Sequence, residues 1–230
     1  MYKRVVLKIS GEALSSDTSA LCEKTIESTA KTLATLQSRG LELGVVVGGG
    51  NILRGRNAAH MERNRADHMG MLSTAINAIA LQDALLRQGA PCTVLSALDM
   101  PAVCDSYSAR LAQQSLSAGK IVIFACGSGC PFFSTDTAAA LRAAEIGAEV
   151  LLLAKNIDAV YSDDPLKNPA ALRYDKLTYD KVVRDNLSAT DLTAITFCRE
   201  HNIPIHVFAL EKILAVFDGK NTGTRIDACE

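Results

Sequence analysis

The chain has 230 residues, of which 48% are apolar and 21% charged, with 24 basic against 25 acidic side chains. These proportions are those of an average globular protein and exclude a disordered chain. A net charge of −1 gives no overall attraction to nucleic acid or to an anionic membrane surface, so we expect neither as a partner. The longest unbroken apolar run, residues 121–126, is far shorter than the ~20 residues that span a bilayer, and we expect no membrane segment.

The seven cysteines are scattered along the chain, with neither a Cys-x-x-Cys motif nor a paired Cys/His spacing. This pattern argues against structural zinc and against a disulfide framework. Near the start of the chain, Lys8 interrupts the apolar stretch, so that stretch does not have the form of a secretory signal. We therefore expect reduced thiols in a cytoplasmic protein.

Apolar periodicity predicts alternating strands and helices over the first two thirds of the chain, which indicates a mainly parallel sheet with helices on both faces. Glycine follows several of the helices at the position where it best ends a helix. In chain order we expect strand 4–9, helix 23–38, strand 43–47, helix 69–87, strand 92–95, helix 106–117, strand 121–126, helix 135–146 and strand 149–154.

After residue 154 the amino-acid composition changes. Residues 158–169 are rich in Asp, Asn and Pro, which is typical of an ordered loop. No low-complexity linker divides the chain, so we expect residues 1–230 to form one continuous α/β domain with two lobes. The remaining expected elements are helices 179–185 and 189–200, strand 205–208, helix 211–217 and a final segment 223–226.

Three of the expected strands end in small, flexible residues, at positions 10–11, 48–50 and 127–129. Ligands of open parallel sheets bind at the carboxyl ends of the strands, and glycine lets backbone N–H groups approach an anion closely. Lys8 and Arg54 stand beside two of these turns, which indicates a polyanionic, phosphate-bearing ligand. The Walker and dinucleotide-binding motifs are both absent, since Leu53 occupies the position of the last glycine in Gly-x-Gly-x-x-Gly.

Two charged residues carry competing interpretations. Burying the charge of Lys8 inside a strand costs free energy unless the side chain points into a site. On an edge strand, by contrast, Lys8 would simply be exposed to water. Its place two residues before Ser10 and Gly11 favours the site, where it would neutralise phosphate charge. Asp67 either caps the long helix or accepts a hydrogen bond from a ligand hydroxyl such as that of a ribose.

The segment 127–136 is the densest functional candidate, because it combines backbone donors, hydroxyl groups, two aromatic rings and a carboxylate. Asp136 either caps the helix that follows or holds Mg²⁺ against phosphates, and we favour the second. Phe132 and Phe133 cannot easily face the same core, so we expect at least one to line a pocket. In the later loop, Tyr161 and Asp164 either form an ordinary turn or enclose a base and its ribose.

These segments together resemble the bacterial uridylate kinases of the amino acid kinase family. The resemblance runs from residue 2 to about residue 226, and it depends on an ordered set of motifs rather than on one. The motifs are 7–14 (LKISGEAL), 48–51 (GGGN) with 54–55 (RG), 67–71 (DHMGM), 104–108 (CDSYS), 131–136 (PFFSTD), 158–165 (DAVYSDDP), 191–192 (DL) and 203–205 (IPI).

The resemblance implies a three-layer α/β sandwich, the amino acid kinase fold, and transfer of phosphate from ATP to UMP with Mg²⁺ in pyrimidine nucleotide (CTP) biosynthesis. It further implies a cytoplasmic homohexamer, with UMP bound mainly by the first two thirds of the chain and ATP mainly by residues after about 150. The implied catalytic residues are Lys8, Arg54 and Asp136, with Asp136 also the Mg²⁺ ligand. The implied ATP-binding residues are Lys8, Ile9, Ser10, Gly11, Gly50, Arg54, Lys155, Tyr161 and Asp164. Of these, Lys155, Tyr161 and Asp164 would contact the adenosine end of ATP. The implied UMP-binding residues are Gly49, Asp67, Ser128, Gly129, Cys130, Pro131, Phe132, Phe133, Ser134 and Thr135.

Two alternative functions stay open on the same fold. A relative that phosphorylates a carboxylate or carbamate would share the Lys8 and Gly11 start but should lack Asp67 and the 131–136 segment. A catalytically silent nucleotide-binding or storage protein would not need Lys8, Arg54 and Asp136 together.

Overall fold

The apolar segment at the start of the chain forms the middle strand of a nine-stranded sheet, β1 (Arg4–Ile9). In this computed structural model, which describes residues 2–53, 61–188, 190–220 and 222–228, β1 pairs in parallel with β2 (Glu42–Val47) and with β6 (Val150–Lys155). The strand order is β4-β3-β5-β2-β1-β6-β10-β11-β9, and β10 with β11 is the antiparallel pair among them. The parallel strands therefore bring their carboxyl ends to a common edge of the sheet.

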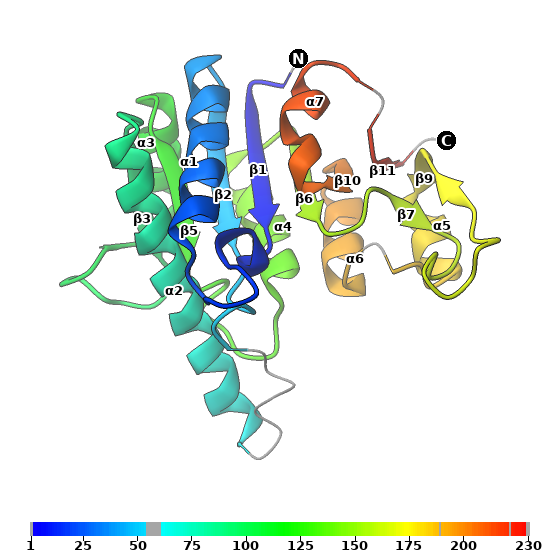
Figure 1. Ribbon diagram of the computed structural model, residues 1–230, viewed down its shortest axis with the longest axis horizontal. Coiled ribbons are helices and arrows are strands. Elements are labelled where there is room, and N and C mark those ends of the chain that lie inside the picture. Colours follow the sequence, from blue (N-terminus) through cyan, green and yellow to red (C-terminus); the bar gives the residue numbers. More distant parts are fainter. Residues whose placement is uncertain (1, 54–60, 189, 221, 229–230) are drawn as a thin grey trace.

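The other elements of the described chain alternate strand and helix over its first two thirds (Figure 1). In chain order they are η1 (Gly11–Leu14), α1 (Glu23–Ser38), α2 (Arg63–Arg87), β3 (Cys92–Ser96), β4 (Asp105–Ser106), α3 (Ala109–Ser117), β5 (Ile121–Ala125), α4 (Thr135–Ile146), β7 (Val160–Tyr161), β8 (Arg173–Tyr174), β9 (Lys176–Thr178), α5 (Tyr179–Arg184), α6 (Leu192–Glu200), β10 (Ile205–Ala209), η3 (Leu210–Lys212), α7 (Ile213–Phe217) and β11 (Thr224–Asp227).

Helices cover both faces of the sheet, so the molecule has three layers. Side chains alternate along β1: Val5 and Leu7 pack into one apolar cluster with α1 and α2, whereas Val6 packs into a second cluster with α3, α4 and α6. Figure 1 shows α1 and α2 on one side of β1 and β2, and α4 on the other. The predicted three-layer α/β sandwich with a mainly parallel central sheet is confirmed.

The long helix α2 is apolar and long enough to cross a membrane, judged by length and composition alone. Half of that stretch is nevertheless buried inside the protein, where Ala78, Leu81 and Leu85 pack into the first apolar cluster. We interpret α2 as a core helix of a globular domain, whose amino-terminal end projects beyond the sheet (Figure 1).

Most expected elements agree with the structure to within one to three residues, but four expectations were wrong. The long helix begins at Arg63 rather than 69, and residues 105–106 pair with β3 as a short strand instead of opening a helix. The 158–169 loop contains β7, which pairs with β8, and β9 was not expected at all. All these strands have two or three residues and depend on distant partners, so no local periodicity predicts them.

Candidate active site

Two lysines extend from neighbouring central strands on the same face of the sheet. In β1, Lys8 lies two residues after Val6, and in β6, Lys155 lies two residues after Leu153. Val6 and Leu153 both pack into the second apolar cluster. Because side chains two residues apart on a strand share a face, both ammonium groups extend toward the helix layer that contains α4. The sheet register thus delivers two positive charges to one point at the carboxyl ends of the strands.

Asp136, in the first turn of α4, forms ion pairs with both lysines. Its Oδ1 lies 2.8 Å from Nζ of Lys8, and its Oδ2 lies 2.9 Å from Nζ of Lys155. The hydroxyl of Thr190 donates a hydrogen bond of 2.6 Å to the same Oδ2. Asp136 as a residue is 8% exposed, a degree of burial that a charge tolerates when it is paired with opposite charge.

The charge of this centre suits an anionic ligand. Burial by itself raises the pKa of Asp136, but the positive charges of Lys8 and Lys155 outweigh it and hold that pKa well below its usual range. Asp136 is therefore ionised at neutral pH, and the three side chains together carry one net positive charge. Ammonium groups held in this way are strong partners for phosphate oxygens.

Ser134, rather than Asp136, caps α4. Its side-chain oxygen accepts hydrogen bonds from the backbone N–H groups of Asp136 at 3.1 Å and of Thr137 at 3.0 Å. The alternative in which Asp136 serves as a helix cap is therefore wrong. Its carboxylate is left for the two lysines.

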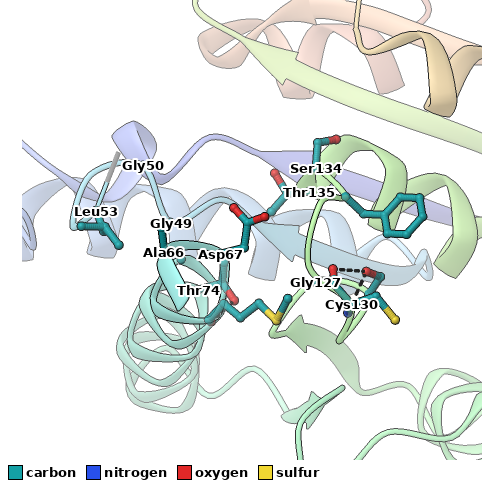
Figure 2. A pocket seen from close by; sticks show the side chains of 14 residues that line it. Gly49, Gly50, Leu53, Ala66, Asp67, Thr74, Gly127, Cys130, Ser134 and Thr135 are labelled. Carbon is teal, nitrogen blue, oxygen red and sulfur yellow. Dashed lines mark hydrogen bonds between the residues drawn. The ribbon is translucent and has the colours of Figure 1, made fainter. Parts of the chain in front are cut away.

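Next to the charged centre, a cavity of about 150 Å³ lies between the amino-terminal half of α2 and the loop that follows β5 (Figure 2). Figure 2 shows Asp67 on α2 facing the segment that carries Ser134 and Thr135. The cavity is lined by Gly49, Gly50, Leu53, Ala66, Asp67, Gly70, Met71, Thr74, Gly127, Ser128, Cys130, Phe133, Ser134 and Thr135.

Seven of the ten residues that the resemblance assigns to UMP line this cavity, and the other three belong to the same loop. Gly50, assigned to ATP, lines it as well. The lining therefore groups one glycine turn, one helix and one loop that are far apart in sequence. The three assigned residues outside the lining are Gly129, Pro131 and Phe132.

The loop after β5 is held in a strained backbone conformation by contacts from two helices. Cys126 and Phe132 have φ angles of +61° and +72°, a region that costs a residue with a side chain about 1–3 kcal/mol. The backbone N–H of Cys126 donates to Thr74 on α2 at 2.8 Å. From α4, the guanidinium of Arg142 donates to the carbonyl oxygen of Gly127 at 3.1 Å. These contacts fix the shape of the cavity wall.

Asp67 is a third anchor of that loop. Its carboxylate accepts a hydrogen bond of 2.8 Å from the backbone N–H of Phe132 and pairs with Arg63 at 2.9 Å. Partial burial raises the pKa of Asp67, but these two partners outweigh it and lower that pKa. The alternative in which Asp67 caps the helix is wrong, because α2 begins four residues earlier and the cap is Glu62, which accepts from the N–H of Asn64.

The two adjacent phenylalanines separate, as expected from their chemistry. Phe133 lines the cavity, whereas the ring of Phe132 lies 5.6 Å from the guanidinium of Arg63 outside it. Both rings are more than half exposed, so neither belongs to the core. One aromatic face is thus available to a ligand in the cavity.

The turns after β1 and β2 touch each other. A Cβ atom at Gly11 would come within 2.7 Å of the carbonyl oxygen of Gly48 and would collide with the side chain of Asn51. The N–H of Gly48 donates to the carbonyl of Ile9 at 2.9 Å. The side chain of Ile9 is fully buried, so Ile9 presents only its backbone at this turn, next to Ser10.

A second cavity, of about 480 Å³, lies in the later part of the chain. Tyr161 and Asp164 line it, and the Tyr161 hydroxyl donates to Asp158 at 2.8 Å. Lys155, which the resemblance groups with these two residues, is not in this lining and lies at the charged centre instead. Asp164 accepts from the backbone N–H of Leu166 at 3.0 Å, so its side chain also organises a turn. Arg54, the remaining assigned residue, lies outside the described residues.

Three residues of the site have no signal in the sequence: Thr74, Arg142 and Thr190. Each acts by a hydrogen bond to a group more than 14 positions away, at separations of 52, 15 and 54 residues. Their roles depend on how the helices are placed relative to the loop and to Asp136, and sequence motifs do not predict that placement.

The model of the amino acid kinase family matches residues 3–209, and the chain therefore belongs to the amino acid kinase family. Among curated relatives, it is 45% identical to a uridylate kinase of Saccharophagus degradans, covering 100% of this chain and 95% of that one. It is 47% identical to a uridylate kinase of Ectopseudomonas mendocina, covering 98% and 94%.

Solved structures give the same result. The UMP kinase of Bacillus anthracis superposes with a TM-score of 0.96 at 35% identity, covering 100% of this chain and 97% of that one. The UMP kinase of Ureaplasma parvum superposes with a TM-score of 0.94 at 36% identity, covering 99% of both. The resemblance to bacterial uridylate kinases that the motifs indicated is confirmed.

Proposed function

We propose that this protein is a UMP kinase, which transfers the γ-phosphoryl group of ATP to UMP and releases ADP and UDP. The observation that carries the proposal is the partly buried charged centre of Lys8, Asp136 and Lys155, which adjoins the first cavity through Thr135. Relatives named uridylate kinase, 45–47% identical over nearly the whole chain, support this reaction over others of the family.

The reaction needs positioning and charge neutralisation more than it needs a protein base. A phosphate oxygen of UMP attacks the γ-phosphorus, and the bond to the oxygen bridging the β- and γ-phosphorus breaks, so that ADP leaves with the electron pair. Lys8 and Lys155 stand where they can neutralise the three oxygens of the transferring group. Arg54 is the further cation that the resemblance assigns to this step.

We assign the two cavities to the two nucleotides. UMP would occupy the first cavity, with Asp67 accepting from a ribose hydroxyl, Phe133 facing the base, and the N–H groups of the 127–135 segment available to its polar edges. The adenosine end of ATP would occupy the second cavity beside Tyr161 and Asp164. Residues 1–230 would then form one domain, with the UMP lobe mainly in the first two thirds and the ATP lobe mainly after about residue 150.

Mg²⁺ would accompany ATP rather than occupy a site built by the protein alone. Within the described ranges, no group of three His, Cys, Asp or Glu side chains gathers as a cation site. Oδ1 of Asp136 is buried, and its partner among the described residues is the ammonium of Lys8 at 2.8 Å. One such carboxylate fits the usual arrangement, in which phosphates and one or two carboxylates hold the ion. The ion supplies charge neutralisation at the phosphates.

We further propose that the protein is a homo-oligomer, with the family's homohexamer as the expected state. Five large apolar side chains on α2, here called the α2 seam, are 39–55% exposed. The first four follow the three-and-four spacing by which two helices bury a common seam, and the fifth lies seven residues, or two turns, further along; this spacing favours a second copy of this chain as the occupant. The α2 seam comprises Met69, Leu72, Ile76, Ile79 and Leu86.

We place the protein in the cytoplasm and its product in pyrimidine nucleotide synthesis. The described cysteines are all free thiols, which suits a reducing compartment. UDP is the precursor class from which a second phosphoryl transfer and an amination would give CTP.

An assay of ADP release tests the proposal. Mg·ATP is supplied with UMP, CMP, dUMP, aspartate, glutamate or carbamate, and the rate without acceptor is the baseline. We expect strong turnover with UMP and none above baseline with aspartate, glutamate or carbamate. Turnover with an amino acid or carbamate would overturn the assignment of the first cavity. Nucleotide binding without turnover would favour the alternative, a silent nucleotide-binding or storage protein.

A further inference from the structure

The amino ends of helices α4 and α6 are joined by hydrogen bonds at the charged centre. Asp191, the cap of α6, accepts from the backbone N–H of Ala194 at 2.8 Å. The same carboxylate accepts from the hydroxyl of Thr137 at 2.8 Å and from that of Ser134. The residue before it, Thr190, therefore has its backbone held in place relative to α4.

The hydroxyl of Thr190 donates a hydrogen bond of 2.6 Å to Oδ2 of Asp136. Thr190 is a neutral donor with a short side chain, whereas the two lysines that bind the same carboxylate are charged and have long side chains. Lys8 and Lys155 each have three donor positions and long, rotatable side chains, so they can turn toward phosphate oxygens. Thr190 is β-branched, with few side-chain rotamers, and its hydroxyl stays with the carboxylate.

This difference matters during phosphoryl transfer. When the ammonium groups move partly onto the transferring phosphate, the carboxylate of a residue that is 8% exposed loses part of its partners. A buried carboxylate without a fixed donor would rotate or draw the lysines back toward itself. A neutral donor holds it without competing for the phosphate.

We infer that Thr190 is a positioning residue whose hydroxyl fixes the Asp136 carboxylate, and through it the places of Lys8 and Lys155 at the reacting phosphates. The inference rests on the proposed function and adds a residue to it.

The test compares Thr190→Val, which keeps the shape and removes the donor, with Thr190→Ser, which keeps the donor. Thr196→Val, in the helix α6 that follows Thr190, is the control, because the hydroxyl of Thr196 donates to the carbonyl of Leu192 within that helix. We expect Thr190→Val to lower kcat with UMP by about tenfold or more, as removal of a donor to an ionised group does. The KM for UMP and the thermal midpoint should stay near those of the wild type.

Rescue separates positioning from packing. Thr190→Ser should retain most of the wild-type kcat, and Thr196→Val should retain all of it. The inference is overturned if Thr190→Val keeps full kcat, if Thr190→Ser is as slow as Thr190→Val, or if the loss follows a lowered thermal midpoint. A wild-type chain that does not turn over UMP would overturn the proposed function and this inference with it, whereas an active wild type with an unimpaired Thr190→Val overturns the inference alone.

Discussion

Lys8 shows how one side chain on a strand acquires a chemical role from its register. It is held 2.8 Å from Asp136 by the sheet, so its charge is already in place before ligands bind. We expect Lys8→Ala to lower kcat by about 10²–10³-fold, while the KM for UMP changes little, because the charge acts mainly on the transferring group. Steady-state kinetics against UMP and ATP measure this. Lys31→Ala, at an exposed lysine of α1, is the control. Equal losses in kcat and in UMP affinity would contradict a role of Lys8 at the transferring group.

Asp67 is predicted to act on UMP rather than on ATP. Its carboxylate lines the first cavity and also holds the backbone N–H of Phe132. We expect Asp67→Ala to raise the KM for UMP by about tenfold or more, the cost of losing a charged acceptor, and to leave the KM for ATP near that of the wild type. Asp67→Asn keeps an acceptor oxygen and should lose less. Asp17→Ala, at an exposed carboxylate outside α2, is the control. A parallel rise in both KM values would show that the two cavities are misassigned.

At the scale of elements, α4 supports the loop after β5 through Arg142, which is 4% exposed. Its guanidinium pairs with Glu145 at 2.6 Å, lies 3.7 Å from the ring centre of Tyr107 and donates to the carbonyl of Gly127. We expect Arg142→Met to lower the free energy of unfolding by about 2–4 kcal/mol, because it removes the opposite charge from Glu145 and the guanidinium donor from the carbonyl of Gly127. It should also raise the KM for UMP, since Gly127 lines the cavity.

Urea unfolding and UMP kinetics measure both effects of Arg142→Met. The matched control is Arg199→Met on α6, whose pair with Asp180 is exposed and is expected to contribute under about 1 kcal/mol. Loss of stability with an unchanged KM for UMP would mean that the loop keeps its shape without Arg142.

Long periodic elements could be predicted from the sequence, and their ends could be predicted where a cap or glycine marks them. The bounds of β1, α1 and α4 agree with the structure because apolar spacing and Gly40 or Gly147 define them. The first turns of α2 were missed because residues 63–68 are polar and mostly exposed, so they have no periodic signal. The short strands and the role of Thr190 depend on tertiary contacts, which a single sequence does not contain.

At the scale of the whole molecule, His206 on β10 makes stability depend on pH. Burial lowers the pKa of His206, although its hydrogen bond to the carbonyl of Thr222 opposes that change, and Arg225 adds to the lowering. Below pH 6.5, the ordinary value, the unfolded chain therefore binds a proton that the folded chain resists. Stability should fall as pH drops from about 7 through the folded pKa.

Urea unfolding at several pH values and constant ionic strength measures this dependence. We expect His206→Gln to flatten the fall below pH 7, because the group that takes up the proton is gone. His201→Gln, at an exposed position on the other side of the 202–204 turn, should keep the wild-type profile. An unchanged slope in His206→Gln would assign the dependence to other groups.

The α2 seam carries the prediction for the assembly as a whole. Burying side chains that are already about half covered gains about 1 kcal/mol each, so five of them repeated on two copies favour association strongly. A charge placed within such a seam must be desolvated without a partner, and it therefore opposes association.

We expect the wild type to have a molar mass several times 24.5 kDa by light scattering, near six copies. The double variant Leu72→Glu with Ile76→Glu should reduce that mass. Leu172→Glu, at a leucine that is 66% exposed and lies away from α2, should leave the mass unchanged. If the double variant keeps the wild-type mass, the assembly uses another surface and the α2 seam needs a different occupant.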